Sequence, residues 1–312
     1  MSPQNRKFAL PFVILFLAAL VLGSCAPAPK APAVVLPPPG PTPVATGLAQ
    51  YMPPADGLVA DIKKRGVLIN GVECQNPPGE YYDTATNKCT GYSIDLAQKL
   101  ADSMGVKLQV VDTAWSGVIP SLYTKNFDLI LSSMTIREDR KKAVNFSTPV
   151  GCDQVVWIVK KGDTGITKPE DLNGKIIATQ LNSAAEQQAT ELETSANIKY
   201  KQLMSFDHFD GAYLAVKNGQ ADIATSTFWN NIPLFKAEPD TYQVAFTLPI
   251  FNYVGIAIRQ QDTDLLKVVN DFLAAEMASG GLGNLQFKYY GYGMNCGDQG
   301  PNLPAGWTPP SP

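Results

Sequence analysis

Histidine is almost absent from this chain, since His208 is the only one among 312 residues. The five cysteines contain no CxxC pair, so the residues that usually bind zinc are too few and too scattered to predict a metal site. A single histidine also leaves no evident pair of nucleophile and base. We therefore expect neither a metal nor a cofactor.

Excess charge of either sign is also missing. The formal net charge is only -3 at pH 7, and part of the positive contribution lies at the N-terminus, in Arg6 and Lys7. No basic face is indicated, so nucleic acid is not an expected partner.

Long apolar runs are scarce, apart from one at the N-terminus. Residues 8–22 are apolar and uncharged, follow Arg6 and Lys7, and lead through two small residues to Cys25. This order is typical of a secretory signal peptide. As a helix the run would rise only about 22 Å, less than the ~30 Å of a bilayer core. We therefore expect residues 1–24 to be a signal peptide.

The sequence LGSC, which ends at Cys25, resembles the bacterial lipobox, whose cysteine becomes the acylated first residue. This resemblance implies an exported lipoprotein, anchored to the cell membrane or the periplasmic face through Cys25. An ordinary signal peptide with a cysteine nearby by chance is the alternative.

Proline-rich segments flank the remainder of the chain. Residues 25–55 are rich in proline and alanine and hold few charges, which predicts an extended, semi-rigid tether. Residues 297–312 form a second segment rich in proline and glycine. The roughly 240 residues between them are enough for two lobes with cores of their own.

Short apolar runs alternate with helical patterns in this central part. Strands are predicted for VLINGV, LQVVD and FDLILSSM, and an amphipathic helix is predicted for IDLAQKLADSMG. Strands that are separated by helices favour a parallel sheet. The pattern repeats from VVWIVKK onward and predicts a second lobe. We expect an α/β fold with a mainly parallel sheet flanked by helices in each lobe: residues 56–150 and 251–296 in lobe 1, and 151–250 in lobe 2. Such a chain crosses between the lobes twice, which suggests a hinge and a ligand in the cleft.

Four cysteines besides Cys25 form an even number in a chain expected to be exported, so disulfides are predicted. Cys74 and Cys89 bracket a turn-rich segment and are the expected local pair. That leaves Cys152 with Cys296, although four cysteines allow three pairings.

Several strings are similar to those of bacterial solute-binding proteins of family 3, the periplasmic binding proteins for polar amino acids. They are GYSIDLAQKLADSMG, WSGVIPSLYTKNFDLILSSMTIREDRKKAVNFSTP, DLNGKIIATQLNS, NGQADIATS and YVGIAI, and they span residues 66–293. The resemblance implies a two-lobe Venus-flytrap fold and a monomer that captures an amino acid or an amino-acid-like solute. It also implies delivery to the membrane permease of an ABC transporter, without catalysis.

The middle string carries the most specific chemistry. Ser132, Ser133 and Thr135 end a buried strand, at the edge where open α/β sheets bind ligands. Arg140 offers a planar fork of donors that matches a carboxylate. The resemblance places Thr135 and Arg140 at the α-carboxylate of the ligand; the alternative is that Arg140 pairs with an acid of its own lobe, such as Glu138.

Three further side chains of lobe 1 are candidates. The resemblance implies that Trp115 stacks on the ligand and that Glu73 faces an ammonium group; a core tryptophan and an exposed acid are the alternatives. Arg137 stands where the family more often has a small hydroxyl residue. It either reaches a second acidic group of the ligand or faces solvent.

In lobe 2, Gln180, Ser183 and Ala184 lie between a predicted strand and a predicted helix. Ser183 can cap this helix, with Glu186 completing a capping box. The same amide groups can hold a carboxylate oxygen of the ligand. Asn182 stands where the family tends to have glycine.

Thr227 marks a departure from the family, which normally has an aspartate there for the α-ammonium group of the ligand. Either Glu73 carries that role alone, or the ligand is not an ordinary α-amino acid, because a buried ammonium needs a negative partner. Phe228 and Trp229 follow. They form a cation cage with Trp115 or pack the lobe, and we favour packing.

Two other functions use the same scaffold. A dehydratase of cyclic precursors of aromatic amino acids would use an acid such as Glu73 as general acid. A tethered ligand sensor would need a signalling segment, and none follows the second lobe in the sequence up to Pro312.

Overall fold

The computed structural model describes residues 51–291, 293–294, 296–297 and 300–301. The expected signal peptide, Cys25 and nearly all of the expected tether and C-terminal tail lie outside these residues. Among the helices that are described, none is long and apolar enough to span a membrane.

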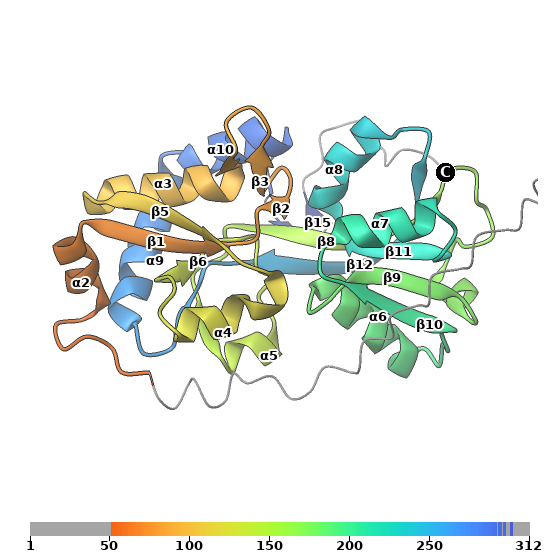
Figure 1. Cartoon of the computed structure of the whole chain (residues 1–312), viewed down its shortest axis with the longest axis horizontal. Coiled ribbons are helices and arrows are strands. Elements are labelled where there is room, and N and C mark those ends of the chain that lie inside the picture. Colours follow the sequence, from red (N-terminus) through yellow and green to blue (C-terminus); the bar gives the residue numbers. More distant parts are fainter. Residues whose placement is uncertain (1–50, 292, 295, 298–299, 302–312) are drawn as a thin grey trace, which may run out of the picture. The chain divides into compact units, whose positions relative to one another are not determined.

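The first sheet draws its strands from both ends of the described chain (Figure 1). Its order is β5 (Lys107–Asp112), β1 (Val67–Val72), β6 (Leu129–Ile130), β13 (Ala257–Arg259) and β7 (Val144–Phe146). β1 runs parallel to β5 and β6, whereas β13 is antiparallel to β6 and β7. The sheet therefore has two parallel and two antiparallel pairs, whereas the βαβ pattern predicts mainly parallel pairs, because the returning strand β13 enters in the opposite direction.

The second sheet also combines parallel and antiparallel strand pairs. Its order is β10 (Gln202–Phe206), β9 (Ile176–Gln180), β11 (Ile223–Thr227), β8 (Gly151–Lys160) and β12 (Tyr242–Val254). β9 runs parallel to β10 and β11, and β8 is antiparallel to β11 and β12. Two helix-flanked sheets make this an α/β fold with two lobes.

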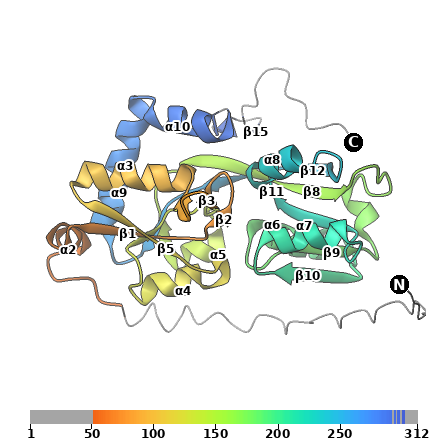
Figure 2. The same ribbon diagram turned by 45° about the horizontal axis from the view of Figure 1, so that its top comes forward.

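Helices cover both sheets (Figure 2). The first sheet is accompanied by α2 (Leu58–Arg65), α3 (Tyr92–Met104), α4 (Val118–Tyr123), α5 (Glu138–Lys141), α9 (Thr263–Ala278), α10 (Gly281–Tyr290) and the 3-10 turn η1 (Trp115–Gly117). The second is accompanied by α6 (Ala184–Ser195), α7 (Phe209–Lys217), α8 (Phe228–Ala237) and the 3-10 turn η2 (Pro169–Leu172).

Helix α3 shows how the sequence specifies such an element. Leu96, Leu100 and Met104 recur at the spacing of one helical face and are buried. The helix ends at Gly105, whose φ of 71° lies in the left-handed region that glycine adopts without strain. The buried face of α3 therefore packs toward the sheet at a fixed register.

Strands β8 and β12 are the long connection between the two lobes. They pair antiparallel along their length, from Tyr242 opposite Lys160 to Val254 opposite Gly151. Figures 1 and 2 show them side by side. Val254 also bridges to Thr135, so the end of the returning strand touches the segment that follows β6.

A small three-stranded sheet, β2 (Gln75–Asn76), β3 (Glu80–Asp83) and β4 (Lys88–Thr90), follows β1. The predicted disulfide between Cys74 and Cys89 is present and closes its base, with 5.8 Å between the two Cα atoms. Gly91 brings this insert against α3, because a side chain at Gly91 would meet the carbonyl oxygen of Gly79 at 2.3 Å.

The second predicted disulfide has one described partner. Cys152 is buried and disulfide-bonded, and its N–H donates to the carbonyl of Met294 at 2.9 Å. The side chain of Cys296 lies outside the described residues, so its pairing with Cys152 remains a prediction.

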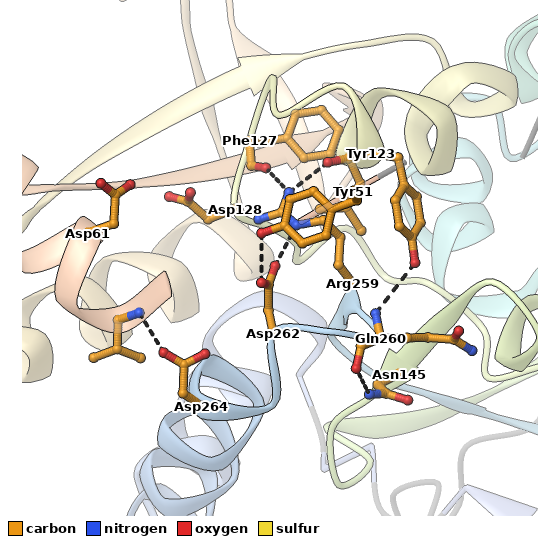
Figure 3. A network of polar contacts seen from close by, with 12 residues as sticks. Tyr51, Asp61, Tyr123, Phe127, Asp128, Asn145, Arg259, Gln260, Asp262 and Asp264 are labelled. Atoms are coloured by element: carbon orange, nitrogen blue, oxygen red, sulfur yellow. Dashed lines mark hydrogen bonds and ion pairs between the residues drawn. The ribbon is translucent and has the colours of Figure 1, made fainter. Parts of the chain in front are cut away.

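A buried ion pair holds the start of the described chain on the first lobe (Figure 3). Arg259 and Asp262 form a salt bridge with side chains only 2% and 0% exposed. The hydroxyl of Tyr51 donates to Asp262 at 2.7 Å, and the guanidinium of Arg259 lies 4.6 Å from the centre of the Tyr51 ring. Arg259 also donates to the carbonyls of Leu122 and Phe127 at 2.6 and 2.9 Å. Residue 51 is thereby part of the first lobe.

Candidate functional site

The carboxylate of Glu73, directly after β1, is contacted from both lobes. Gln180 of the second lobe donates to both carboxylate oxygens at 2.9 Å, and Asn76 donates to one of them at 2.9 Å. The Nδ1 atom of His208 lies 2.8 Å from the same carboxylate. Glu73 is only 1% exposed, and burial raises its pKa, although the hydrogen bonds from Gln180 and His208 act in the opposite direction.

Ser132 and Ser133 face a second acid, Glu80 of the stapled insert. Ser132 Oγ accepts from the N–H of Glu73 at 3.1 Å and donates to Glu80 at 3.0 Å, while Ser133 donates to Glu80 at 3.4 Å. The hydroxyl of Ser132 is therefore already engaged on both sides. Its predicted contact with a ligand would have to use its backbone or an exchange of partners.

Glu80 is fully buried, and burial raises the pKa of its carboxyl to about 8, with the charge of Glu73 acting in the same direction. The folded chain therefore binds this proton more tightly than the unfolded chain, in which the group has a pKa near 4.5. The stabilisation is complete below about pH 4.5 and is lost as pH rises toward about 8.

We expect Glu80→Gln, which mimics the protonated acid, to reduce the loss of stability between pH 5 and 8. Urea unfolding at a series of pH values measures this. Asp153, whose pKa burial raises to about 7, contributes a decline of the same sign, so some slope should persist. An identical slope in the variant and the wild type would contradict the assignment to Glu80.

Arg140 is buried, with 6% of its surface exposed. It donates to the carbonyl of Thr135 at 3.0 Å and to that of Asn182, in the second lobe, at 2.7 Å. Its guanidinium lies 5.3 Å from the centre of the Trp115 ring. Burial lowers the pKa of Arg140 to about 9, and the charge of Arg137 adds to this effect.

Acids near Arg140 are bound by other cations. Glu138 pairs with Lys141 at 2.7 Å, and Asp139 pairs with Arg137 at 2.5 Å. Within the described ranges, no carboxylate lies at ion-pair distance from Arg140. Asp139 still acts on Arg140 through its charge, but among these residues no acid forms a salt bridge with Arg140.

Arg137 does not stand free in solvent. Besides Asp139, it donates to the carbonyl of Ser183 in the second lobe at 2.9 Å. Its side chain is 15% exposed. Arg137 therefore contributes a contact between the lobes, which neither of the two sequence-based alternatives included.

The backbone carbonyl of Asn182 is the common acceptor for the first lobe. It accepts from Trp115 Nε1 at 3.3 Å, from Arg137 at 3.4 Å and from Arg140 at 2.7 Å. Asn182 has a φ of 60°, a left-handed conformation that asparagine tolerates better than most residues. Asn182 thus has a backbone conformation that glycine also adopts without strain.

Ser183 caps α6 as predicted, because its Oγ accepts from the N–H of Glu186 at 3.0 Å. The carboxylate of Glu186 accepts from the N–H of Asn182 at 2.6 Å, one residue before the position of a standard capping box. Ala184 is buried and begins the helix.

Thr227 points toward an acid from the neighbouring strand. Its hydroxyl donates to Asp153 of β8, which also accepts from the N–H groups of Phe228 and Trp229 at the start of α8. Asp153 is 7% exposed. A carboxylate therefore lies beside position 227, although the sequence has none there.

Phe228 and Trp229 pack inside the second lobe. Their rings lie 5.1 Å apart edge to face, and Trp229 donates to the carbonyl of Cys152 at 2.8 Å. Both are buried. These contacts support the packing interpretation over a cation cage with Trp115.

Sequence reasoning missed four polar residues of this region, namely Asn76, Glu80, Asp153 and His208. His208 lies between β10 and α7, at the end of the second sheet. Its position after a strand is the signal that identified Glu73 and Gln180, and could have identified it. In the described part of the chain, no group of three metal-binding residues is present.

Comparison with known proteins identifies the family of this chain. The family of bacterial extracellular solute-binding proteins, family 3, matches residues 68–292. The L-cystine-binding protein TcyJ of Escherichia coli is 31% identical over 237 residues, which cover 76% of this chain and 87% of TcyJ. The ABC transporter arginine-binding protein 1 of Escherichia coli is 32% identical over 219 residues, 67% of this chain and 85% of that protein.

Two solved structures have the same fold. A mutant of ArgBP from T. maritima superposes with a TM-score of 0.67 at 35% identity and covers 75% of this chain and 99% of its own. The ancestral amino-acid-binding protein AncCDT-1, a precursor of cyclohexadienyl dehydratase, has a TM-score of 0.68 at 32% identity, with 74% and 99% covered. The match over residues 68–292, together with two α/β lobes that meet at Glu73 and Arg140, shows that this chain belongs to the bacterial extracellular solute-binding proteins of family 3.

Proposed function

We propose that this protein binds an amino acid or an amino-acid-like solute between its lobes and delivers it to the permease of an ABC importer, without catalysing a reaction. The observation that carries the proposal is Arg140, a buried guanidinium that donates to backbone carbonyls, lies over the Trp115 ring and forms no salt bridge among the described residues. Burying a charge is costly unless it meets an opposite charge. The carboxylate of an amino acid supplies that charge.

The remaining recognition groups follow from the same geometry. Thr135 lies beside Arg140 at the end of the segment after β6 and provides a hydroxyl for the carboxylate. Trp115 provides a ring surface, and Glu73 is an acid for a cationic group of the ligand. The names of the relatives support an amino acid as the class of ligand, since TcyJ binds L-cystine and other matched proteins bind arginine.

Binding would be coupled to closure of the lobes. Glu73 and Arg140, both of the first lobe, already contact Gln180 and Asn182 of the second. A ligand held by Glu73 and Arg140 therefore lies against groups from both sides. Only a ligand that favours the closed arrangement shifts the population toward it.

Export and lipid anchoring belong to the proposal as well. LGSC at residues 22–25 supports acylation of Cys25, and the following proline-rich residues would separate the lobes from the membrane. We propose that the protein acts as a monomer on the outer side of the cell membrane. Mass spectrometry of the membrane fraction would detect a diacylated or triacylated N-terminal cysteine.

A thermal-shift screen tests the binding function. The chain should begin after Cys25, so that Tyr51 and its buried contacts are retained. We expect stabilisation by L-cystine, L-arginine, L-lysine or L-glutamine, and a ligand at 100 times its dissociation constant adds about 2.7 kcal/mol. Shifts with di-acids alone would contradict the role of Glu73.

A dehydratase function is the second candidate, because AncCDT-1 is described as a precursor of cyclohexadienyl dehydratase. The general acid would be Glu73, whose pKa is raised by burial. AncCDT-1 itself is described as an amino-acid-binding protein. Turnover of a cyclohexadienyl substrate in the absence of amino-acid binding would favour the enzyme.

A further inference from the structure

His208 is the sole histidine of the chain and lies across the lobe boundary from its partner. It precedes α7 in the second lobe, and its Nδ1 atom is 2.8 Å from Oε1 of Glu73 in the first. When Glu73 is ionised, its carboxylate has no hydrogen to donate, so the ring nitrogen then carries the hydrogen in this contact. The side chain of His208 is 32% exposed, whereas that of Glu73 is 2% exposed.

The carboxylate of Glu73 is already filled by donors of the protein. Gln180 reaches both oxygens, while Asn76 and His208 each take one. The backbone N–H of Trp115 donates as well. A carboxylate offers about four acceptor positions. A cationic group of a ligand must therefore displace one of these donors to reach Glu73.

The donors differ in how firmly they are held. Gln180 is 2% exposed and also donates to the carbonyl of Asp207 at 3.0 Å. Asn76 is 7% exposed and accepts from Asn230 at 3.2 Å. For the side chain of His208, the contact with Glu73 is the only hydrogen bond found within the described ranges. His208 is thus the donor that can leave at the lowest cost, since its ring is already partly in water.

We infer that His208 is a specificity-determining residue of the ligand site, because it competes with a cationic group of the ligand for the carboxylate of Glu73. The inference rests on the proposed amino-acid-binding function. Removing His208 frees an acceptor position of Glu73 and should strengthen the binding of cationic ligands. A ligand that leaves Glu73 untouched gains nothing from the same change.

A double-mutant cycle separates competition from a general effect on the fold. We expect His208→Ala to tighten the binding of L-arginine about threefold to tenfold, the equivalent of one hydrogen bond. In the Glu73→Gln background the same change should alter the dissociation constant less than twofold. Isothermal titration of the four chains gives the cycle. Gln187→Ala, which removes an exposed amide of α6 bonded to Glu191, is the matched control and should leave binding unchanged.

The outcomes distinguish this inference from the proposed function. Binding of L-arginine that is unchanged or weaker in His208→Ala would overturn the competition. Failure of the wild type to bind L-arginine, L-cystine or any other amino acid would instead overturn the proposed function, and the inference with it.

The single histidine also gives a direct spectroscopic test in a chain without a histidine tag. We expect saturation with L-arginine to shift the imidazole NMR signals of His208 in the wild type, because the ring loses its carboxylate partner. The shift should be much smaller in Glu73→Gln, where that partner is neutral from the start. Imidazole signals that stay in place while L-arginine binds would show that His208 remains on Glu73, contrary to the inference.

Discussion

Arg140→Ala should abolish binding of the amino-acid ligand while leaving the protein folded. Arg140 is buried, its fork donates to the carbonyls of Thr135 and Asn182, and among the described residues it forms no salt bridge that would compete with a ligand carboxylate. Removing one partner of a desolvated charge pair costs about 2–5 kcal/mol. This corresponds to roughly 30-fold to several thousand-fold in the dissociation constant. Isothermal titration with the ligand identified by the thermal-shift screen measures it.

Arg137→Ala is the matched control for this prediction. Arg137 is three residues away and also contacts the second lobe, but it is paired with Asp139, which is 53% exposed. Such pairs contribute at most about 1 kcal/mol. We expect less than a tenfold loss. Equal losses in the two variants would remove Arg140 from its assigned role and indicate that any change at this contact between the lobes is sufficient.

Arg259→Ala should cause the largest loss of stability. The change leaves Asp262 buried at 0% exposure without its cation, and it leaves the carbonyls of Leu122 and Phe127 without their donor (Figure 3). Breaking a buried ion pair by removing one partner costs about 3–5 kcal/mol. Urea unfolding, followed by circular dichroism, should show a correspondingly lower midpoint or a chain that no longer folds at 37 °C.

Lys267→Ala tests whether the loss of stability expected for Arg259→Ala depends on the burial of its ion pair. Lys267 and Asp271 form a pair on α9 whose side chains are 76% and 65% exposed. We expect a change within about 0.5 kcal/mol, because exposed pairs on a helix contribute little. Arg259→Lys retains the charge without the planar fork, so its loss of stability should lie between those of Arg259→Ala and Lys267→Ala. A loss below 1 kcal/mol in Arg259→Ala would contradict the importance of this network.

Local pattern predicts the helices and strands of this chain well, because their apolar positions repeat at the spacing of each element. The helix expected at residues 94–105 is observed as Tyr92–Met104, and the strand expected at residues 67–72 is β1. Sheet direction was harder to predict. β13 enters the first sheet antiparallel to β6 after a long excursion through the second lobe, and periodicity carries no information on strand direction.

The candidate site likewise contains residues that the sequence identifies and residues that only the structure reveals. Glu73, Gln180 and Arg140 are identifiable because they follow strands or stand in a specific motif, and the structure brings them to contacts between the lobes. Asp153 lies beside Thr227 only because β8 and β11 are neighbours in the sheet, with Thr227 opposite Val155. Glu80 reaches Ser132 only because the insert folds back. These partners are far apart in sequence, so they depend on a strand order that the sequence alone does not reveal.

The position of Tyr51 has a mechanical consequence. Its ring and hydroxyl are held in the core of the first lobe by Arg259 and Asp262. A force applied through the preceding residues is therefore transmitted to the first lobe. The second lobe is joined to the first by the strands β8 and β12 and by contacts such as those of Gln180 with Glu73 and of Asn182 with Arg140. If the lobes open and close as proposed, Tyr51 stays with the first lobe, and the second lobe is the part that would move relative to it.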